Sequence, residues 1–488
     1  MRFMMKMLRG ESEFISLGKE YGLVPVLAEI SSGGRGASAL FGALKSDERF
    51  AFLMEGDGRD VHRGRYAVMG CAPLKTFELR GGDEARGRGY LGRLREYVEA
   101  ARAFPDPLLP PFSSGLFGYF AYEATAFFDD LFHDAPEKKL PGSELPLAFF
   151  FSPGLVVVLD RREEKATLAR FVDTAGKNPE ELSESYRSAA AQLRRSAERL
   201  TTAVSSEVDR PVFSKRFSPT IGKETFMERV SAAREAIRSG EAYQIVLSQR
   251  FETEAPEDPL ALYEALRREN PSPYHFFFET PDATLVGASP EILVRVQDGR
   301  VISRPLAGTR RRGETPLEDA ALETELKADV KERAEHVMLV DLARNDTART
   351  CRPESVTVTE FMEVERFARV MHIVSQVEGA LRPGESSLDV LRTSFPAGTV
   401  SGAPKIRAME IIAELEGAAR NSYAGAFCAL GFDGNLDSCI AIRTFSISGG
   451  KLHLQVGAGV VYDSDPAAEY QETLHKANAL FRALGPAA

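Results

Sequence analysis

Two pairs of glutamates, each spaced three residues apart, are the first candidates for chemistry in this sequence. Glu332 and Glu335 lie in KADVKERAEHVMLVDL, and Glu469 and Glu472 lie in EYQETLHK. A spacing of three places both carboxylates of a pair on one helix face. Two such helices can converge on one cation, and oxygen ligands without a Cys/His cluster favour Mg²⁺ over zinc. A lone pair of this kind is more often a solvated charged face, so spacing alone leaves both interpretations open.

Arg443 is a candidate for binding a carboxylate. It stands in IAIRTFSI, which we expect to be one strand whose face also carries Ala441, Phe445 and Ile447. An arginine on an apolar face is seldom left unpaired. It forms either a structural salt bridge or a bidentate clamp on a substrate carboxylate. Tyr423, just before the preceding expected strand, can add a hydroxyl.

Two runs without bulky side chains are candidates for close contact with a ligand. They are Gly457–Gly459, in LHLQVGAGVV, and Ala307–Thr309, in RPLAGTRRRG. Glycine weakens a strand unless another group must approach the backbone closely, and exposed amides there suit a carboxylate. On the pattern alone, a β-bulge is the favoured explanation. His372 stands on the apolar run VMHIVS, where a histidine is more often a core residue than a catalyst.

The elements that must position these residues differ between the two halves of the chain. Residues 1–200 alternate short β-like runs such as FAFLM with loops rich in glycine and arginine, and they end in the helical stretch SYRSAAAQLRRSAERL. The polar segment TTAVSSEVDRP, closed by Pro211, is the best linker candidate. We therefore predict an N-terminal domain over 1–205 and a C-terminal domain over 206–488.

The second half carries clearer strand and helix signals. In AYQIVLSQRF, Tyr243, Ile245 and Leu247 alternate with other residues, which predicts a half-buried strand. AFCALGF, SCIAIRTFSI and LHLQVGAGVV, separated by glycine-containing turns, predict an antiparallel meander. Asp465 and Pro466 predict the start of a terminal helix. Meanders with interposed helices favour an α+β fold over a doubly wound parallel sheet.

Composition is that of an ordinary globular protein and argues against several classes of function. The 488 residues are 43% hydrophobic and 27% charged, with a formal net charge of −10. An acidic chain is a poor partner for nucleic acid or an anionic membrane, and no run approaches the about 18 apolar residues of a membrane span. The four cysteines lie far apart, with neither metal-ligand spacing nor a disulfide framework. We therefore expect reduced thiols and a cytoplasmic location.

Long segments of the second half occur together in one order: GEAYQIVLSQRF, NPSPYHFF, GASPE, RPLAGTRRRG, KERAEHVMLVDLARND, VMHIVSQVEG, PAGTVSGAPKIRAMEII, DSCIAIRTF, GAGVVYDSDP and EYQETLHKA. They resemble the chorismate-utilising enzyme family, most closely its members that make anthranilate. The resemblance spans nearly all of residues 220–482 and is thinner in the N-terminal half. It implies a four-layer α/β/β/α sandwich of the α+β class, with two large antiparallel sheets. It also implies chorismate, which carries two carboxylates, as the substrate.

The resemblance gives the glutamates distinct roles. It places Mg²⁺ on Glu335 and Glu472, bridging to the ring carboxylate of chorismate. Glu332 and Glu469 stand behind these two ligands. Glu291, in GASPE, corresponds to the acid that protonates the departing 4-hydroxyl group.

Further residues match substrate contacts of the family. Tyr423 and Arg443 fall where the family holds the enolpyruvyl carboxylate. His372 and Thr399 correspond to residues near the enolpyruvyl group, where pyruvate leaves. The remaining implied chorismate contacts are Gln244, Gly308, Thr309, Gly457, Ala458, Gly459 and Lys476.

Two positions distinguish the members of the family. Relatives that form isochorismate or salicylate have a lysine base where this chain has Gln244, and aminodeoxychorismate synthases have a nucleophilic lysine where it has Ala307. Both differences point to anthranilate formation from chorismate and ammonia. No glutaminase triad is visible, so the resemblance implies a separate glutamine amidotransferase subunit. A relative that stops at aminodeoxyisochorismate, and a non-catalytic regulator that binds chorismate or tryptophan, remain the alternatives.

The resemblance also implies a tryptophan feedback pocket in the N-terminal half. Its expected residues are Glu55 and Gly56, together with Pro273, Tyr274 and His275. The family usually has Leu-Glu-Ser where this chain has Met-Glu-Gly, so Gly56 lacks a hydroxyl. We therefore expect tryptophan to bind and inhibit, but less tightly than in a relative with the serine.

Overall fold

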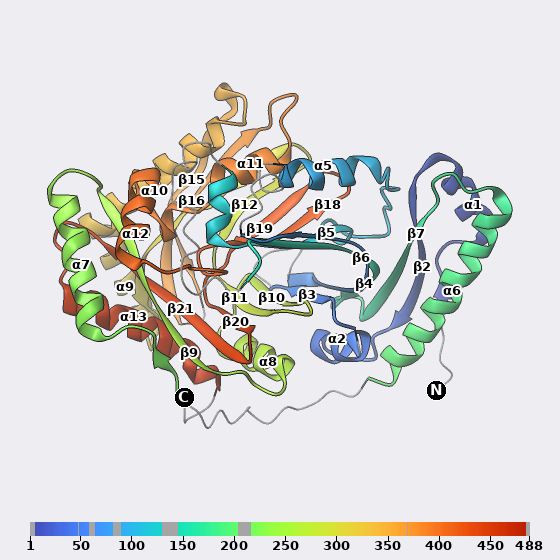
Figure 1. The fold of residues 1–488 in the computed structure, drawn as a ribbon, viewed down its shortest axis with the longest axis horizontal. Coiled ribbons are helices and arrows are strands. Elements are labelled where there is room, and N and C mark those ends of the chain that lie inside the picture. Colours follow the sequence, from blue (N-terminus) through green and yellow to red (C-terminus); the bar gives the residue numbers. More distant parts are fainter. Residues whose placement is uncertain are drawn as a thin grey trace.

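A computed structural model of the chain has an α+β fold, and 21 strands within its described residues form one hydrogen-bonded network (Figure 1). The named strands pair with antiparallel neighbours throughout. The structure describes residues 5–46, 48–57, 64–81, 89–128, 145–203, 216–367 and 369–484.

The network divides into two large sheets, which we call the first and the second sheet. They share β4 and β6, whose pairing runs the whole length of both strands and shifts in register between Pro73 and Lys75. On its other edge, β6 pairs with β5 through residues 148–151 and with β7 through residues 155–160. The long β4–β6 ladder therefore belongs to both sheets and joins them.

The first sheet contains strands from both halves of the chain. Its order is β1 (Lys6–Met7), β2 (Leu23–Ser31), β7 (Lys165–Asp173), β6 (Ala148–Asp160), β4 (Tyr66–Leu79), β3 (Ala51–Glu55), β10 (Tyr274–Glu279), β11 (Thr284–Ser289), β20 (Thr444–Ser448), β21 (Lys451–Val460) and β9 (Gln244–Glu254), with β8 (Ser218–Pro219) and β17 (Gly402–Ala403) on the outer edge of β9.

The second sheet continues from β6 in the other direction. Its order is β5 (Gly115–Phe120), β18 (Ala426–Gly431), β19 (Leu436–Ile440), β12 (Ile292–Gln297), β13 (Arg300–Ser303), β16 (Val370–Ala380) and β15 (Thr357–Arg366), with β14 (Leu306–Arg311) on the same edge of β16 as β13.

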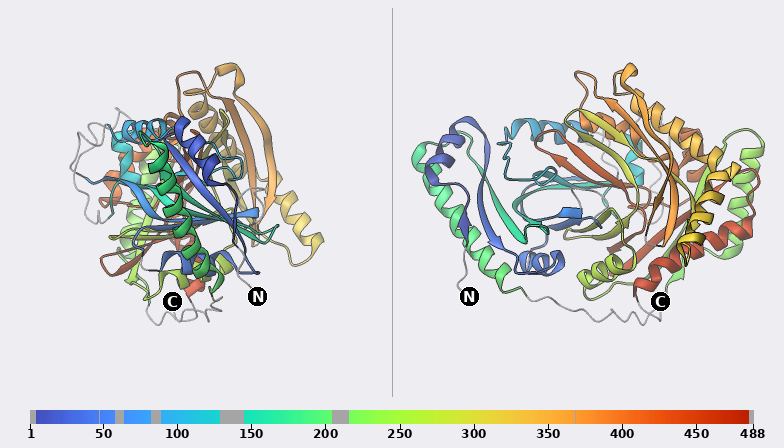
Figure 2. Two further views of the ribbon diagram at one scale, coloured as in Figure 1. Left: turned by 90° about the vertical axis from the view of Figure 1, so that its right-hand side faces the viewer. Right: turned by 180° about the vertical axis from the view of Figure 1, so that it is seen from behind.

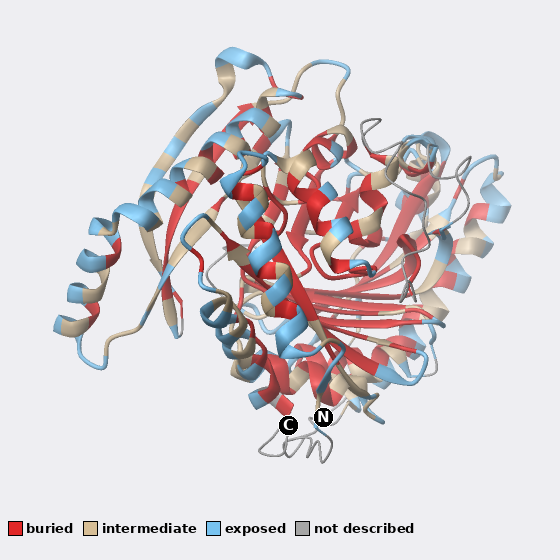
Figure 3. Cartoon of the chain, turned by 60° about the vertical axis from the view of Figure 1, so that its left-hand side comes forward, coloured by how far each residue is buried: buried red, intermediate tan, exposed pale blue. Residues whose placement is uncertain are grey.

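Helices cover the outer faces of both sheets, which gives the four layers expected from the sequence (Figures 1 and 2). In Figure 3 the central strands are almost wholly buried, whereas the edge strands β14 and β15 are intermediate or exposed, and the helices are exposed on one side. Over the first sheet lie α1 (Glu11–Glu20), α2 (Ala37–Lys45), α6 (Pro179–Thr201), α7 (Lys223–Arg238), α8 (Pro259–Glu269), α12 (Lys405–Glu416) and α13 (Pro466–Phe481); over the second lie α5 (Tyr90–Ala100), α9 (Pro316–Ala328), α10 (Val330–Ala348) and α11 (Ser387–Ser394). Short 3₁₀ turns are η1 (Tyr122–Phe127), η3 (Pro353–Ser355), η4 (Gly398–Val400) and η5 (Arg482–Leu484).

The two helices that carry the glutamate pairs begin with side-chain caps. Asp329 accepts hydrogen bonds from the backbone amides of Lys331 and Glu332 at the start of α10. At the start of α13, Asp465 caps the amide of Ala468, and proline occupies the first turn, as the sequence predicted. An acidic cap satisfies amides that lack partners within the helix, so both glutamate pairs lie at well-defined helix starts.

An aromatic core fills the space between the two sheets. It contains Phe52 and Phe276 of the first sheet, and Phe117 and Phe427 of the second, all nearly inaccessible to solvent. The rings of Phe276 and Phe427 stack with centroids 4.4 Å apart and an interplanar angle of 3°. Neighbouring residues such as Phe277 face the helices instead, because successive side chains of a strand point to opposite faces.

The predicted domain boundary at 205/206 lies within 204–215, outside the described residues, and stays a prediction. Strands on either side of it are nonetheless directly paired, since β3 pairs with β10 and β5 with β18. The two halves therefore share sheets and a core. Within the described ranges, no helix is both long and apolar enough to cross a membrane.

The stacked pair between the sheets leads to a stability prediction. Replacing Phe276 by alanine removes a ring from a densely packed core, so we expect the free energy of unfolding to fall by about 3–5 kcal/mol in urea denaturation. Leu317→Ala, at a side chain 83% exposed, is the control and should change it by less than about 0.5 kcal/mol. Equal effects of the two substitutions would contradict this account of the core.

Candidate active site

The site is built where two strands cross from one sheet to the other. Glu291 lies between β11 of the first sheet and β12 of the second, and Arg443 lies between β19 of the second and β20 of the first. The amide of Ile440 donates to the carbonyl of Glu291 at 3.1 Å, and the amide of Ala288 donates to the carbonyl of Arg443 at 3.1 Å. The two crossing segments are thus bonded to each other.

This crossing corrects two expectations from the sequence. IAIRTFSI is not one strand, because β19 ends at Ile440 and β20 begins at Thr444. Arg443 sits in the break with a φ of 50°, a left-handed conformation that is uncommon for residues other than glycine. The expected meander is likewise split, since β18 and β19 form a hairpin in the second sheet, and β20 and β21 form one in the first.

Glu291 has the properties of a proton donor. Its side chain is buried, and the hydroxyl of Thr399, in η4, donates to its Oε1 at 3.0 Å. Burial raises the pKa of Glu291 to about 8, although the Thr399 hydrogen bond and the charge of Arg443 act in the opposite direction. The carboxyl group is therefore protonated at neutral pH and can act as a general acid.

The glycines of β21 make room for two polar side chains. A Cβ at Gly457 would collide with the hydroxyl of Tyr423, and one at Gly459 would lie 2.8 Å from Nε2 of Gln244. The pairing of β21 with β9 is regular from Lys451 to Val460, so the β-bulge explanation is wrong for this run. Close approach of side chains, the other reading of the sequence, explains it. Burial raises the pKa of Tyr423 to about 12, which keeps its phenol protonated.

The second run of small residues does contain a bulge. The register of β14 against β16 shifts between Ala307 and Arg310, and Gly308 has a φ of 67°. Its carbonyl accepts a hydrogen bond from Nδ1 of His372 at 2.8 Å, and the hydroxyl of Thr309 lies 3.1 Å from the same nitrogen. The bulge therefore orients the imidazole ring, which is buried.

The four glutamates face one another across α10 and α13. Burial raises the pKa of Glu335, and the negative charges of Glu332, Glu472 and Glu469 raise it further, whereas Lys331 opposes them. The pKa of Glu469 is also raised, first by burial, and its Oε2 is buried without a hydrogen-bond partner. The two helices thus hold an excess of negative charge between them.

A hard divalent cation fits this arrangement in its chemistry. The available donors are carboxylate oxygens, which Mg²⁺ prefers. The buried Oε2 of Glu469 lacks a hydrogen-bond partner, and a water bound to such a cation would supply one. Among the described residues, no three acidic, histidine or cysteine side chains already form a metal-binding cluster. Basic groups engage two of the carboxylates instead: Lys476 lies 2.7 Å from Glu472, and Arg310 lies 3.1 Å from Glu332.

Contacts between these groups assemble most of the predicted residues into one site. Lys476 donates to the carbonyl of Gly457 at 2.8 Å, which ties α13 to β21. A Cβ at Gly308 would lie 3.2 Å from Glu332, which brings β14 close to α10. The turn η4, with Thr399, packs against both α10 and β21. Ala458, between the two β21 glycines, is fully buried.

The residues predicted to bind tryptophan form a separate group on β3 and β10. Glu55 pairs in register with His275, and its buried carboxylate contacts Arg161 and accepts a hydrogen bond from Tyr263 of α8 at 2.6 Å. Tyr274 points the other way and donates to Asp437 of the second sheet at 2.9 Å. The side chains of Glu55 and Tyr274 thus lie on opposite faces of the first sheet.

His275, Gly56 and Pro273 lie beside Glu55 in this second group of residues. Burial lowers the pKa of His275 to about 4, so its ring is neutral at physiological pH. Gly56 and Pro273 flank a backbone contact in which the amide of Asp57 donates to the carbonyl of Ser272 at 3.1 Å. The feedback pocket stays a prediction, and its occupation requires the groups around Glu55 to exchange partners.

One buried ion pair behind the site was missed in the sequence. Glu416 is the last residue of α12 and Arg420 follows four residues later; both side chains are almost inaccessible to solvent. Within α12, Arg407 and Glu410 form an exposed pair three residues apart. Because local spacing does not distinguish the two pairs, only the tertiary structure identifies the buried one.

Comparisons with known proteins agree with this geometry. Residues 50–482 match the family model described as chorismate binding enzyme. Anthranilate synthase component 1 of Streptomyces coelicolor is 42% identical over 480 residues, which covers 96% of this chain and 90% of that protein. The crystal structure of anthranilate synthase component I from Streptococcus pneumoniae superposes with a TM-score of 0.74 and 36% identity, covering 85% of this chain and 92% of that one. The menaquinone-specific isochorismate synthase of Escherichia coli, 19% identical, shares the fold with a TM-score of 0.71 over 97% of this chain and 99% of that one.

The raised pKa of Glu291 predicts a pH-dependent contribution to stability. An acid whose pKa rises from 4.5 when unfolded to about 8 when folded binds its proton more tightly in the folded state, so its contribution falls as pH rises between these values. Glutamine does not ionise, so Glu291→Gln does not lose stability in this way. Between pH 5 and pH 8, the free energy of unfolding of the variant in urea should rise by about 1–4 kcal/mol relative to that of the unsubstituted protein. A difference that stays constant over this range would show that Glu291 titrates normally.

Proposed function

Because this chain belongs to the family of chorismate binding enzymes, we propose that it converts chorismate and ammonia into anthranilate and pyruvate. The observation that carries the proposal is the buried Glu291, whose pKa of about 8 keeps it protonated beside Arg443 and Thr399. Displacement of a ring hydroxyl by ammonia needs such an acid, since hydroxide is a poor leaving group unless it is protonated. The relatives named anthranilate synthase component 1 cover nearly the whole chain.

The residues of the site divide the reaction between them. Arg443 and the hydroxyl of Tyr423 hold the enolpyruvyl carboxylate. Ammonia attacks C2 of the ring, and Glu291 gives its proton to the departing 4-hydroxyl, which leaves as water. The ammonium group formed at C2 loses a proton. The hydrogen on C2 then leaves as a proton while the bond from C3 to the enolpyruvyl oxygen breaks, and a proton adds to the methylene carbon of the released enolpyruvate to give pyruvate. Pyruvate leaves beside His372 and the ring becomes aromatic.

Glutamates on α10 and α13 would hold Mg²⁺, with Glu335 and Glu472 as its ligands and Glu332 and Glu469 behind them. When bound, the ion neutralises and orients the ring carboxylate of chorismate. The buried, unpartnered Oε2 of Glu469 and the raised pKa of Glu335 support this assignment. Amides of the β21 glycine run and the Gly308 bulge provide further donors for the carboxylates.

Two positions favour ammonia over other nucleophiles. Gln244, whose amide lies against Gly459, cannot deprotonate water as a lysine would. Ala307, beside the bulge of β14, provides no amine that could attack the ring. The ammonia would come from a separate glutamine amidotransferase subunit, in line with the name component 1 of the relatives. The four cysteines are free and buried, which suits the reducing cytoplasm.

The assay for this function uses chorismate, Mg²⁺ and an ammonium salt, with anthranilate followed by its fluorescence and pyruvate by a coupled reaction. Formation of both products is expected. Aminodeoxyisochorismate without pyruvate would instead identify a relative that stops before elimination. Absence of any turnover, with chorismate or tryptophan still bound, would identify a non-catalytic regulator.

Removing either proposed Mg²⁺ ligand tests the metal site. Glu335→Ala and Glu472→Ala should each lower turnover at limiting Mg²⁺ by at least roughly a hundredfold, because the substrate carboxylate is then poorly neutralised. The circular dichroism spectrum and the melting temperature should stay close to those of the unsubstituted protein. Glu414→Ala, at an exposed glutamate of α12, is the control. Near-normal activity of either ligand variant would defeat the assignment.

Feedback by tryptophan is the remaining proposal for this function. The ligand's ammonium group has to compete with Arg161 and Tyr263 for Glu55, and Gly56 offers no hydroxyl. We expect tryptophan to bind weakly and inhibit, and Gly56→Ser to tighten binding by about tenfold to a hundredfold, the value of one hydrogen bond to a charged group. Calorimetric titration of both proteins measures this. Equal affinities would exclude Gly56 as a determinant, and no binding to either protein would mean that the site is absent.

A further inference from the structure

Arg420 is the largest fully buried side chain in the described part of the protein. It follows α12, and its guanidinium group pairs with Glu416 through Nε at 2.8 Å and Nη2 at 2.6 Å. The group also donates to two backbone carbonyls, that of Val400 at 2.8 Å and that of Val246 at 2.7 Å. A salt bridge alone would not require these carbonyl contacts.

The two carbonyls belong to segments that carry active-site residues. Val400 follows Thr399 in η4, and Thr399 holds Glu291. Val246 lies in β9, directly opposite Gly459 of β21. The guanidinium carbon also lies 5.6 Å from the ring centroid of Tyr423. One side chain therefore contacts three segments of the site, which are distant in sequence.

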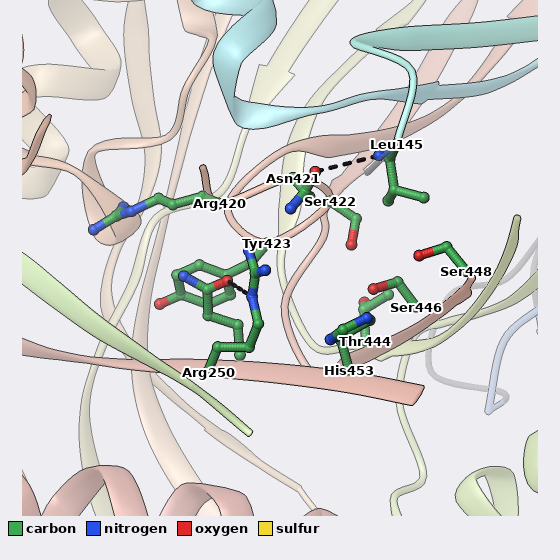
Figure 4. Close-up of a pocket in the computed structure, with 11 residues that line it drawn as sticks. Leu145, Arg250, Arg420, Asn421, Ser422, Tyr423, Thr444, Ser446, Ser448 and His453 are labelled. Atoms are coloured by element: carbon green, nitrogen blue, oxygen red, sulfur yellow. Dashed lines mark hydrogen bonds between the residues drawn. The ribbon is translucent and has the colours of Figure 1, made fainter. Parts of the chain in front are cut away.

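Figure 4 shows the loop that connects Arg420 to Tyr423, with the Arg420 side chain extending away from Asn421 and Ser422. Asn421 has a φ of 54° and Ala424 a φ of 62°. Asparagine tolerates this left-handed conformation, whereas it costs about 1–2 kcal/mol in a residue such as alanine. Glu123 holds this loop, since its carboxylate accepts hydrogen bonds from the amides of Arg420 at 2.6 Å and Asn421 at 3.1 Å. Arg420 therefore anchors the loop twice: its backbone amide donates to Glu123, and its side chain bonds to Glu416 and the two carbonyls.

We propose that Arg420 is a positioning residue for the active site: its guanidinium fork fixes Thr399, Tyr423 and the start of β9 relative to one another without touching the substrate. The proposal rests on the reaction assigned above. Stability is a poor alternative explanation, because a buried ion pair often contributes little net stability. A planar fork with several fixed donors suits this task, whereas lysine offers a single point charge.

Arg420→Lys is the variant that tests the proposal. It keeps the positive charge beside Glu416 but cannot reach both carbonyls in the same geometry. Arg9→Lys is a matched control, since Arg9 is also buried, pairs with Asp106 at 2.5 Å and lies 5.0 Å from the ring centroid of Phe104. It lies in the N-terminal part of the chain, and none of its contacts involves the site.

Steady-state kinetics and pH profiles separate positioning from stability. In Arg420→Lys, kcat/KM for chorismate should fall by about 10- to 100-fold, the effect of a small misplacement of reacting groups, with both a raised KM and a lowered kcat. Loss of the Thr399 hydrogen bond should raise the pKa of Glu291, so the alkaline limb of the kcat profile should move up by roughly half to one pH unit. Arg9→Lys should lose stability without any of these changes.

A second variant covers the case in which Arg420→Lys does not fold. Arg420→Met combined with Glu416→Gln removes both charges of the ion pair, and the glutamine can still accept the hydrogen bonds of Ser248. Glu123 keeps its hydrogen bonds from the backbone amides of residues 420 and 421. This double variant should show the same kinetic changes. A crystal structure of either variant should show that Thr399 and Glu291 have separated, which is independent of any assay.

The outcomes distinguish the two proposals. If the unsubstituted protein and Arg9→Lys form no anthranilate, the proposed function fails, and the crystal structure alone then decides whether Arg420 positions Thr399. If both are active and a folded Arg420 variant keeps their kcat, KM and pH profile, the positioning role is overturned. The same changes in Arg9→Lys would overturn it as well, because they would reflect lost stability.

Discussion

The active site depends on two chain segments that cross together from one sheet to the other. Where a strand leaves its sheet inside a buried core, its amides and carbonyls lose their ladder partners and must find others. Here the two crossings partner each other, through Ile440 and Glu291 on one side and Ala288 and Arg443 on the other. The two crossing segments are therefore hydrogen-bonded to each other, and they carry the acid Glu291 and the arginine Arg443.

Burial explains how an acidic protein prepares this junction for an anionic substrate. The packing that excludes water from the crossing also keeps Glu291 protonated and Tyr423 neutral, so neither adds negative charge near the substrate. On α10 and α13 the same effect raises the pKa of Glu335 and Glu469, and the proposed Mg²⁺ would offset the negative charge there. Uncharged donors, together with this proposed ion, would accommodate a dicarboxylate despite the net charge of −10.

Local patterns in the sequence predicted what depends on neighbours along the chain. The glutamate pairs do lie on single helix faces, the β21 glycines do lie in a strand, and Asp465 does cap the last helix. The pattern gave no sign that IAIRTFSI breaks at Arg443, because a strand that changes sheets has the same alternation as one that continues. The burial of Arg420 was equally hidden, since it results from contacts with segments far away in sequence. The layered architecture came from the family resemblance and was confirmed.

The N-terminal half has a direct structural connection to the chemistry. β3 pairs with β10, β10 with β11, and β11 leads into the crossing that carries Glu291. A second connection runs through η1, where Glu123 holds the loop before Tyr423. Each link is a hydrogen-bonded contact in a close-packed core. The two halves are therefore joined by continuous hydrogen bonding, and two strand pairings connect Glu55 of β3 to the strand that leads to Glu291.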